Sequence, residues 1–165
     1  MHHYTTSEIH AFALLLFFSG YFFWKAIRLW KYFRKRSLLS RNKTLKKLKR
    51  LSWDDFELFC KELFEREGWK VKGNSQKGAD GGVDLWMSRH STLRKNTTAI
   101  VQCKRYDETR VTIKVIREMY GLMYEYEADK AFIVTTSAFT KECYAFVEGK
   151  NIELINGNTL LKMIN

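Results

Sequence analysis

The chain has 165 residues, three widely spaced cysteines and no proline, which allows one ordinary domain with an appendage and excludes a disulfide framework. Its net charge is +11, but residues 25–50 carry 12 Lys and Arg and no acidic residue, whereas residues 51–165 carry 17 basic and 17 acidic residues. The overall charge is therefore no argument that the globular part binds nucleic acid.

The N-terminal segment Ile9–Trp24, "IHAFALLLFFSGYFFW", is apolar on all sides. A surface helix would show a polar stripe. The segment has 16 residues, close to the ~20 that cross a bilayer core. We therefore expect one transmembrane helix within residues 1–30. A secretory signal peptide and a buried core helix are the alternatives, but the positive charge follows the apolar run instead of preceding it.

The basic residues that follow predict orientation and location. An excess of Lys and Arg after the apolar run predicts the N-terminus outside and the rest of the chain in the cytoplasm, held at the cell (inner) membrane by a single pass. We interpret residues 31–50 as a solvated juxtamembrane linker near anionic lipid headgroups. Contact of this basic run with a DNA backbone is the alternative.

Residues 51–165 show the periodicities of a mixed domain. Ser52 is a plausible N-cap for a helix over Asp54–Glu67, since apolar residues then recur near a 3.6-residue period. Three strands, expected as an antiparallel meander, follow at Trp69–Lys72, Val83–Met87 and Ala99–Lys104.

The second half of the domain alternates helices and strands. The expected order is a helix, a buried parallel strand, a helix, a strand and a helix, over Val115–Tyr126, Lys130–Ser137, Ala138–Glu148, 151–156 and Thr159–Ile164. The whole order is α-β-β-β-α-β-α-β-α. This predicts a mixed sheet with helices on both faces, in the α/β or α+β class. The tryptophans, Trp86 included, are interpreted as core or rim residues.

Three polar residues interrupt two of the predicted strands. Because strand side chains alternate, Gln102 and Lys104 project to one face while Cys103 faces the other. Asp84 lies between two apolar residues of the preceding strand, so we expect it to meet Gln102 and Lys104 at one edge. An ordinary ion pair between strands would give the same pattern.

Such a group suits phosphodiester hydrolysis with a hard divalent cation, since Mg²⁺ takes oxygen ligands. The Asp84 carboxylate, the Gln102 side-chain carbonyl and the Cys103 main-chain carbonyl would supply three. Lys104 would stabilise the charged phosphate. Glu57, on the first predicted helix, could hold a bound water or a second cation.

Residues 51–164 resemble the Mrr-type restriction endonuclease family of the PD-(D/E)XK nuclease superfamily. The resemblance rests on five stretches in the family's order: "WDDFELFCKELFEREGWKV", "KGADGGVDL", "VQCKRY", "FIVTTSAFTKECYAF" and "IELINGNTL".

The resemblance implies a restriction-endonuclease-like α/β fold with an α-β-β-β-α-β core, and a DNA endonuclease that uses Mg²⁺ or Mn²⁺. Asp84, Gln102, Lys104 and Glu57 match the family's catalytic positions. Gln102 departs from the acidic residue of the superfamily pattern, as is usual in the Mrr branch.

We thus expect a membrane-anchored DNA endonuclease of restriction type, suited to defence against foreign DNA. A homodimer and a separate specificity partner are further expectations. One alternative is an inactive nuclease-like module that binds DNA or a partner at the membrane, and another is an RNA nuclease or junction resolvase on the same core. Asp80, Arg105, Arg117 and Thr136 are candidate DNA contacts.

Overall fold

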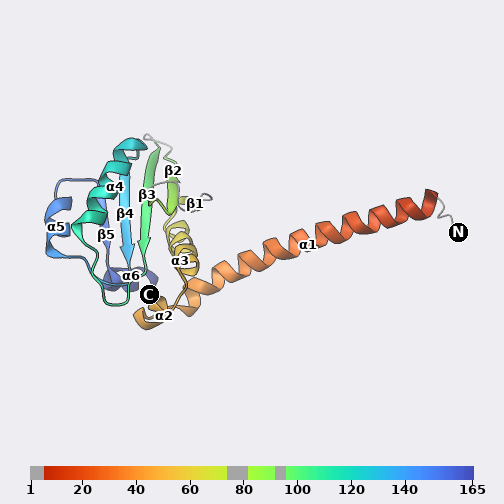
Figure 1. Cartoon of the computed structure of the whole chain (residues 1–165), viewed down its shortest axis with the longest axis horizontal. Helices are drawn as coiled ribbons and strands as arrows, with labels where there is room; N and C mark the ends of the chain where they lie inside the picture. The colour runs from red at the N-terminus through yellow and green to blue at the C-terminus, as the bar shows by residue number, and fades with distance from the viewer. Residues whose placement is uncertain (1–5, 74–81, 92–95) are drawn as a thin grey trace. The chain divides into compact units, whose positions relative to one another are not determined.

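The computed structural model describes residues 6–73, 82–91 and 96–165, and leaves out the side chains of residues 6–13 and 31–37. The chain divides into two compact units, residues 1–37 and 38–165. The first consists of most of helix α1 (Thr6–Arg41), which has 36 residues. The second unit holds the sheet (Figure 1).

The sheet has five strands in the order β1-β2-β3-β4-β5, which is also their order along the chain. Strands β1, β2 and β3 are antiparallel neighbours, whereas β3, β4 and β5 run parallel. The parallel steps require crossover connections, which helices supply. The strands are β1 (Lys70–Gly73), β2 (Leu85–Arg89), β3 (Thr97–Lys104), β4 (Lys130–Thr135) and β5 (Ile152–Ile155).

One face of the sheet is covered by α3 (Trp53–Arg66) and α6 (Gly157–Ile164). Side chains from this face of β3, among them Val101 and Cys103, join the helices in one apolar cluster. Alternation along the strand explains this, since odd-numbered residues of β3 point to this face. The Ser52 hydroxyl accepts a hydrogen bond from the main-chain N–H of Asp55 at 3.1 Å, which makes Ser52 the N-cap of α3 as predicted.

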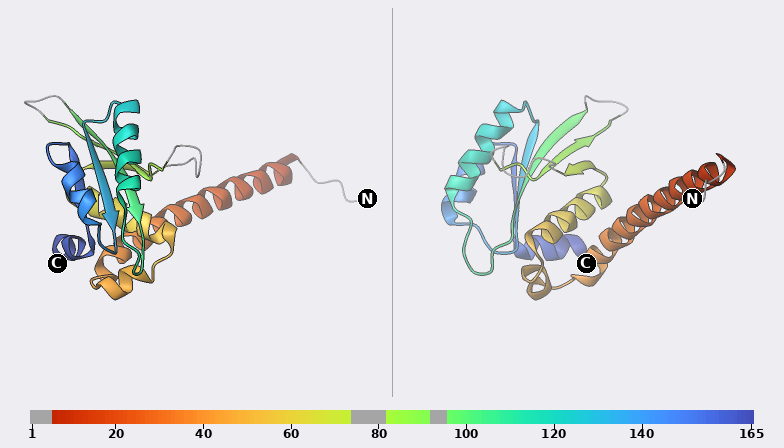
Figure 2. Two further views of the ribbon diagram at one scale, coloured as in Figure 1. Left: turned by 60° about the vertical axis from the view of Figure 1, so that its left-hand side comes forward. Right: turned by 45° about the vertical axis from the view of Figure 1, so that its right-hand side comes forward.

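The other face carries α4 (Ile113–Glu125) and α5 (Lys141–Val147). Ile100 and Ile133, from β3 and β4, pack here against Ile116 and Met119 of α4. Figure 2 shows the helices on both sides of the sheet. The predicted mixed sheet with flanking helices is thus confirmed, including the antiparallel meander and the buried parallel strand.

The basic segment is more structured than a solvated linker. α1 continues to Arg41, and α2 (Leu45–Lys49) follows it. Leu39 and Leu48, both within the predicted linker 31–50, are buried in the cluster under α3. Leucines spaced at a helical interval among the lysines explain this burial, and they place residues 38–50 with the globular unit.

Helix α1 contains the predicted membrane segment, Ile9–Trp24. From Leu14 to Trp30, its large apolar side chains are exposed, and Phe17 and Phe23 are about 70% accessible. Within the part of the chain that the structure describes, none of the helices reaches the length and apolarity that a membrane crossing requires.

Candidate active site

Asp84 lies immediately before β2, where the chain joins the edge of β3. Its main-chain N–H donates to the carbonyl of Val101 at 2.9 Å, and Leu85 is paired with Val101 in the ladder. The continuation of this register sets Asp84 opposite Gln102, so both side chains lie on the same face of the sheet. The Asp84 carboxylate oxygen Oδ2 accepts a hydrogen bond from the main-chain N–H of Cys103 at 2.6 Å.

Gln102 points its amide into the protein, next to Gly82. The side chain is 3% exposed, and its Oε1 has no hydrogen-bond partner among the described residues. A Cβ added at Gly82 would lie 2.6 Å from Gln102 Nε2, and Gly82 has a φ of +105°. Glycine therefore meets two demands here, a left-handed backbone and room for the amide.

The Cys103 carbonyl points toward Asp84. In an extended strand, the N–H and C=O of one residue face the same neighbour, and the Cys103 N–H binds the Asp84 carboxylate. The carbonyl of Lys104 faces the opposite neighbour, since it accepts from Thr135 Oγ1 of β4 at 2.7 Å. The Asp84 carboxylate, Gln102 Oε1 and the Cys103 carbonyl thus come from one corner of the sheet.

This corner fits a hard divalent cation. A buried carbonyl oxygen without a partner is costly unless a ligand completes it, and Gln102 Oε1 is such an atom. Within the described residues, no group of three His, Cys, Asp or Glu side chains could hold a metal. The predicted ligands differ from such a group because two of the three are carbonyl oxygens.

The pKa of Asp84 is raised above its usual value of 3.8. Burial is the largest cause, while the Cys103 N–H and the positive charge of Lys104 act in the opposite direction. Lys104 projects to the same face of β3 as Gln102, since it lies two residues further along the strand. A bound cation would favour the ionised form in the same way.

Glu57 lies half-buried on α3, on the Cys103 side of the sheet. The pKa of the Cys103 thiol is raised well above its usual value, first by a hydrogen bond to Cys60 and by burial, and further by the nearby Cys60, Asp84 and Glu57 side chains. The Asp84 carboxylate thus binds the main chain of Cys103, while Glu57 lies on the helix that packs against the Cys103 side chain.

The other predicted DNA contacts that the structure describes have partners within the protein. The Arg105 guanidinium donates to the carbonyl of Lys49 at 2.6 Å, and Arg117 lies over the ring of Phe146 on the α4 side. Thr136 is fully buried and donates to the carbonyl of Tyr106 at 2.7 Å, so its hydroxyl has no exposed surface for a phosphate. Asp80 lies outside the described residues.

Glu118 of α4 is a residue that the sequence analysis did not single out. Its Oε1 would lie 3.6 Å from a Cβ added at Gly82, so it flanks the same glycine as the Gln102 amide. The available signal was weak: Glu118 is an acidic residue on a predicted helix, and only the packing of that helix brings it to Gly82.

Comparison with known proteins gives one family match. The model of the Mrr_cat family, described as restriction endonuclease, matches residues 48–164. No curated protein matches the sequence.

Solved structures that are similar to the chain include two restriction endonucleases. The DNA modification-dependent restriction endonuclease AspBHI has a TM-score of 0.60 and 15% identity, over 79% of this chain and 35% of that chain. The MspJI restriction endonuclease in complex with a 27-mer oligonucleotide has a TM-score of 0.46 and 20% identity, over 66% of this chain and 26% of that chain. The chain therefore spans about a third or less of the length of either one.

Proposed function

Because the chain belongs to the Mrr_cat restriction endonuclease family, we propose that it is an endonuclease that hydrolyses DNA phosphodiester bonds with a divalent metal at the corner of Asp84 and Gln102. The observation that carries the metal dependence is the buried Gln102 Oε1, which lacks a partner among the described residues and lies on the sheet face of the Asp84 carboxylate. Mg²⁺, with Mn²⁺ as a substitute, is the ion of the right hardness for these oxygens.

The residues divide the work by their chemistry. The Asp84 carboxylate, Gln102 Oε1 and the Cys103 carbonyl would hold the ion, which when bound polarises the phosphate. Lys104 stabilises the negative charge that develops on the phosphate oxygens. Glu57, which comes from α3 on the other face of the sheet, would reach around the edge at Cys103 to accept the proton of the attacking water. The new O–P bond forms as the P–O bond to the 3′-oxygen breaks. That oxygen takes a proton from water, which leaves a 3′-hydroxyl and a 5′-phosphate.

The replacement of an acidic residue by Gln102 lowers the negative charge of the site. Glu118 supplies a carboxylate beside the Gln102 amide, from another helix. We include it in the site as a positioning residue, whose carboxylate flanks Gly82 beside the Gln102 amide and limits how that amide can turn.

The test is cleavage of supercoiled plasmid by the full chain in mild detergent, with Mg²⁺, Mn²⁺ or EDTA. Asp84→Asn and Lys104→Met should each lower the cleavage rate by ~10²-fold or more, as expected for loss of a group that stabilises the transition state. Glu148→Gln, an exposed carboxylate of the same domain, should cleave at the parent rate. Labelled-duplex anisotropy should show that the variants still bind DNA.

Three outcomes separate the alternatives. Binding without cleavage in any metal would favour a nuclease-like binding module. Faster cleavage of an RNA of the same sequence would favour an RNA nuclease, and faster cleavage of a four-way junction would favour a resolvase. Cleavage that persists in EDTA would contradict the metal site.

We further propose that α1 holds the domain at the cell membrane, with the N-terminus outside and the nuclease in the cytoplasm. The exposed apolar side chains of Leu14–Trp30 support this placement, since such a surface needs lipid or protein to cover it. Defence against incoming DNA would suit a nuclease at that place. A homodimer that cuts both strands, and a specificity partner, belong to the same proposal.

A further inference from the structure

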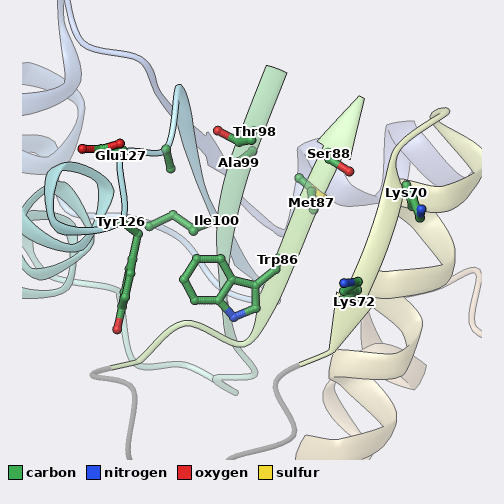
Figure 3. A pocket seen from close by; sticks show the side chains of 11 residues that line it. Lys70, Lys72, Trp86, Met87, Ser88, Thr98, Ala99, Ile100, Tyr126 and Glu127 are labelled. Atoms are coloured by element: carbon green, nitrogen blue, oxygen red, sulfur yellow. The ribbon is translucent and has the colours of Figure 1, made fainter. Parts of the chain in front are cut away.

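A cavity of about 420 Å³ lies on the α4 face of the sheet, beside the ion-holding corner. Its walls come from β1, β2, β3 and the end of α4, and Figure 3 shows its side chains. The volume falls within the ~300–1,000 Å³ of pockets that bind small ligands. None of the residues that match the family's catalytic positions lines this cavity.

Strand register connects this cavity to the active site. Lys72 pairs with Trp86, and Trp86 pairs with Ile100, so these three side chains form one row across a single face. Asp84 and Gln102 form the next row on the same face, two residues along each strand. At ~3.4 Å per residue, the rows are ~7 Å apart, or two steps of a DNA strand at its ~3.4 Å rise.

Aromatic side chains form one wall of the cavity. The ring of Trp86 meets that of Tyr126 edge to face, with centroids 4.7 Å apart and planes at 78°. Trp86 is half-buried and Tyr126 is 36% exposed, so their rings are anchored and still accessible. Flat rings of this kind stack on nucleobases and add ~1–3 kcal/mol per base.

The opposite wall is cationic. Lys70 and Lys72 of β1 are exposed, and within the described residues no ion pair or hydrogen bond engages either ammonium. Figure 3 shows the two lysines on one side of the cavity and Tyr126 and Glu127 on the other. Lysines on an edge strand also prevent sheet-to-sheet pairing, but that role does not require an aromatic pair facing them.

Glu127 occupies a position where glycine is usual. It follows the C-cap of α4 with a φ of +49°, while Ala128 N–H donates to the carbonyl of Met123 at 2.9 Å. This is a Schellman motif, whose left-handed position costs ~1–2 kcal/mol for a residue with a Cβ. The side chain at this strained position lines the cavity, and its carboxylate can accept a hydrogen bond from a base amino group.

We propose that this cavity receives a single unpaired nucleobase of the DNA strand near the cut. The base stacks on the ring of Trp86 and meets the ring of Tyr126 edge to face, Glu127 accepts a hydrogen bond from its amino group, and Lys70 and Lys72 bind the adjoining phosphates. The inference rests on the proposed nuclease function and narrows its substrate to DNA that carries, or readily yields, an unpaired nucleotide beside the scissile bond.

The experiment measures binding by the full chain with Asp84→Asn, which blocks cleavage, in mild detergent and EDTA. Two labelled duplexes of one sequence are compared, one fully paired and one with a single-nucleotide bulge. Extruding a paired base costs a few kcal/mol, so the bulged duplex should bind at least ~10-fold more tightly.

Further changes in the same background test the cavity. Trp86→Leu, Tyr126→Leu and Lys72→Gln should each reduce the preference for the bulge to about twofold or less. Tyr124 lies in α4, close to Tyr126, and is 65% exposed but does not line the cavity. Tyr124→Leu should therefore keep the full preference. Because Tyr126 and Lys72 are at the surface, their variants test the cavity even if Trp86→Leu fails to fold.

Each outcome bears on a different claim. Equal binding of the two duplexes by the Asp84→Asn chain, or a bulge preference that survives Tyr126→Leu and Lys72→Gln, would overturn the cavity proposal and leave the nuclease proposal standing. No binding of either duplex would overturn both.

Discussion

At the scale of single residues, Gly82 makes the most specific demand in the candidate site. Its backbone has a φ of +105°, and a Cβ there would lie 2.6 Å from Gln102 Nε2. Gly82→Ala should therefore displace the Gln102 amide, lower metal-dependent cleavage at least ~10-fold and reduce the free energy of unfolding by ~1–3 kcal/mol. Plasmid cleavage and urea unfolding measure the two effects.

Gly68 provides the matched control for that substitution. It has a φ of +86°, but no atom lies within 4 Å of an added Cβ. Gly68→Ala should show a similar loss of stability. In buffer without denaturant, it should cleave DNA at the parent rate. Equal cleavage by both variants would mean that the contact between Gly82 and Gln102 does not matter for catalysis.

The raised pKa of Asp84 predicts how the free energy of unfolding changes with pH. Because its pKa is raised above 3.8, mainly by burial, its contribution favours the folded state below pH 3.8 and is lost as the pH rises through the folded-state pKa. In EDTA at pH 7 the ionised carboxylate therefore weakens the fold. Asp84→Asn should then have a higher free energy of unfolding than the parent, by an excess that shrinks as the pH falls toward 3.8.

Urea unfolding at several pH values measures that excess, and Glu148→Gln is the control with an exposed carboxylate. A lower stability of Asp84→Asn at pH 7 would mean that the Cys103 N–H and Lys104 outweigh burial. Added Mg²⁺ should reverse the ranking, because the ion stabilises only a chain whose Asp84 can bind it.

At the scale of helices and strands, local patterns predicted the order and type of the elements in residues 51–165. The N-cap at Ser52 and the alternation in β3 are local properties, so the helix and the face of Gln102 followed from them. Boundaries differ because tertiary pairing sets them. Pairing with β2 extends β3 back to Thr97, while α5 is confined to Lys141–Val147 after an isolated bridge between Val111 and Phe139.

The same limit applies to the site. Asp84, Gln102 and Lys104 could be grouped from two strands because an antiparallel meander keeps neighbours in sequence close in space. The position of Glu118 and the pairing of Trp86 with Tyr126 could not be predicted. α4 lies far along the chain from Gly82 and Trp86, and only tertiary packing brings it to them. Trp86 was interpreted as a core or rim residue, and the structure shows it half-buried in the wall of a cavity.

At the scale of the whole molecule, the division after Ser37 yields a prediction about fragments. The full chain should sediment with membranes and resist extraction with alkaline carbonate, because the apolar side chains of Leu14–Trp30 need a cover. A fragment of residues 38–165 should remain in the supernatant. Recovery of the full chain in the supernatant would contradict the proposed membrane attachment.

The start of that fragment matters for its folding. Leu39 and Leu48 are buried in the core, so a fragment of residues 51–165 should melt at a lower temperature than one of residues 38–165. Loss of a buried leucine side chain typically costs ~2–5 kcal/mol. Equal melting temperatures would mean that residues 38–50 contribute nothing to the domain.

Sequence alone was sufficient for the class of the fold, the order of its elements and the grouping of Asp84, Gln102 and Lys104. These properties depend on periodicity and on neighbours close along the chain. Tertiary structure was needed for the assignment of residues 38–50 to the domain, for Glu118 beside Gly82 and for the cavity between β1 and α4. Each of these depends on contacts between segments far apart in sequence, which local hydropathy and spacing do not encode.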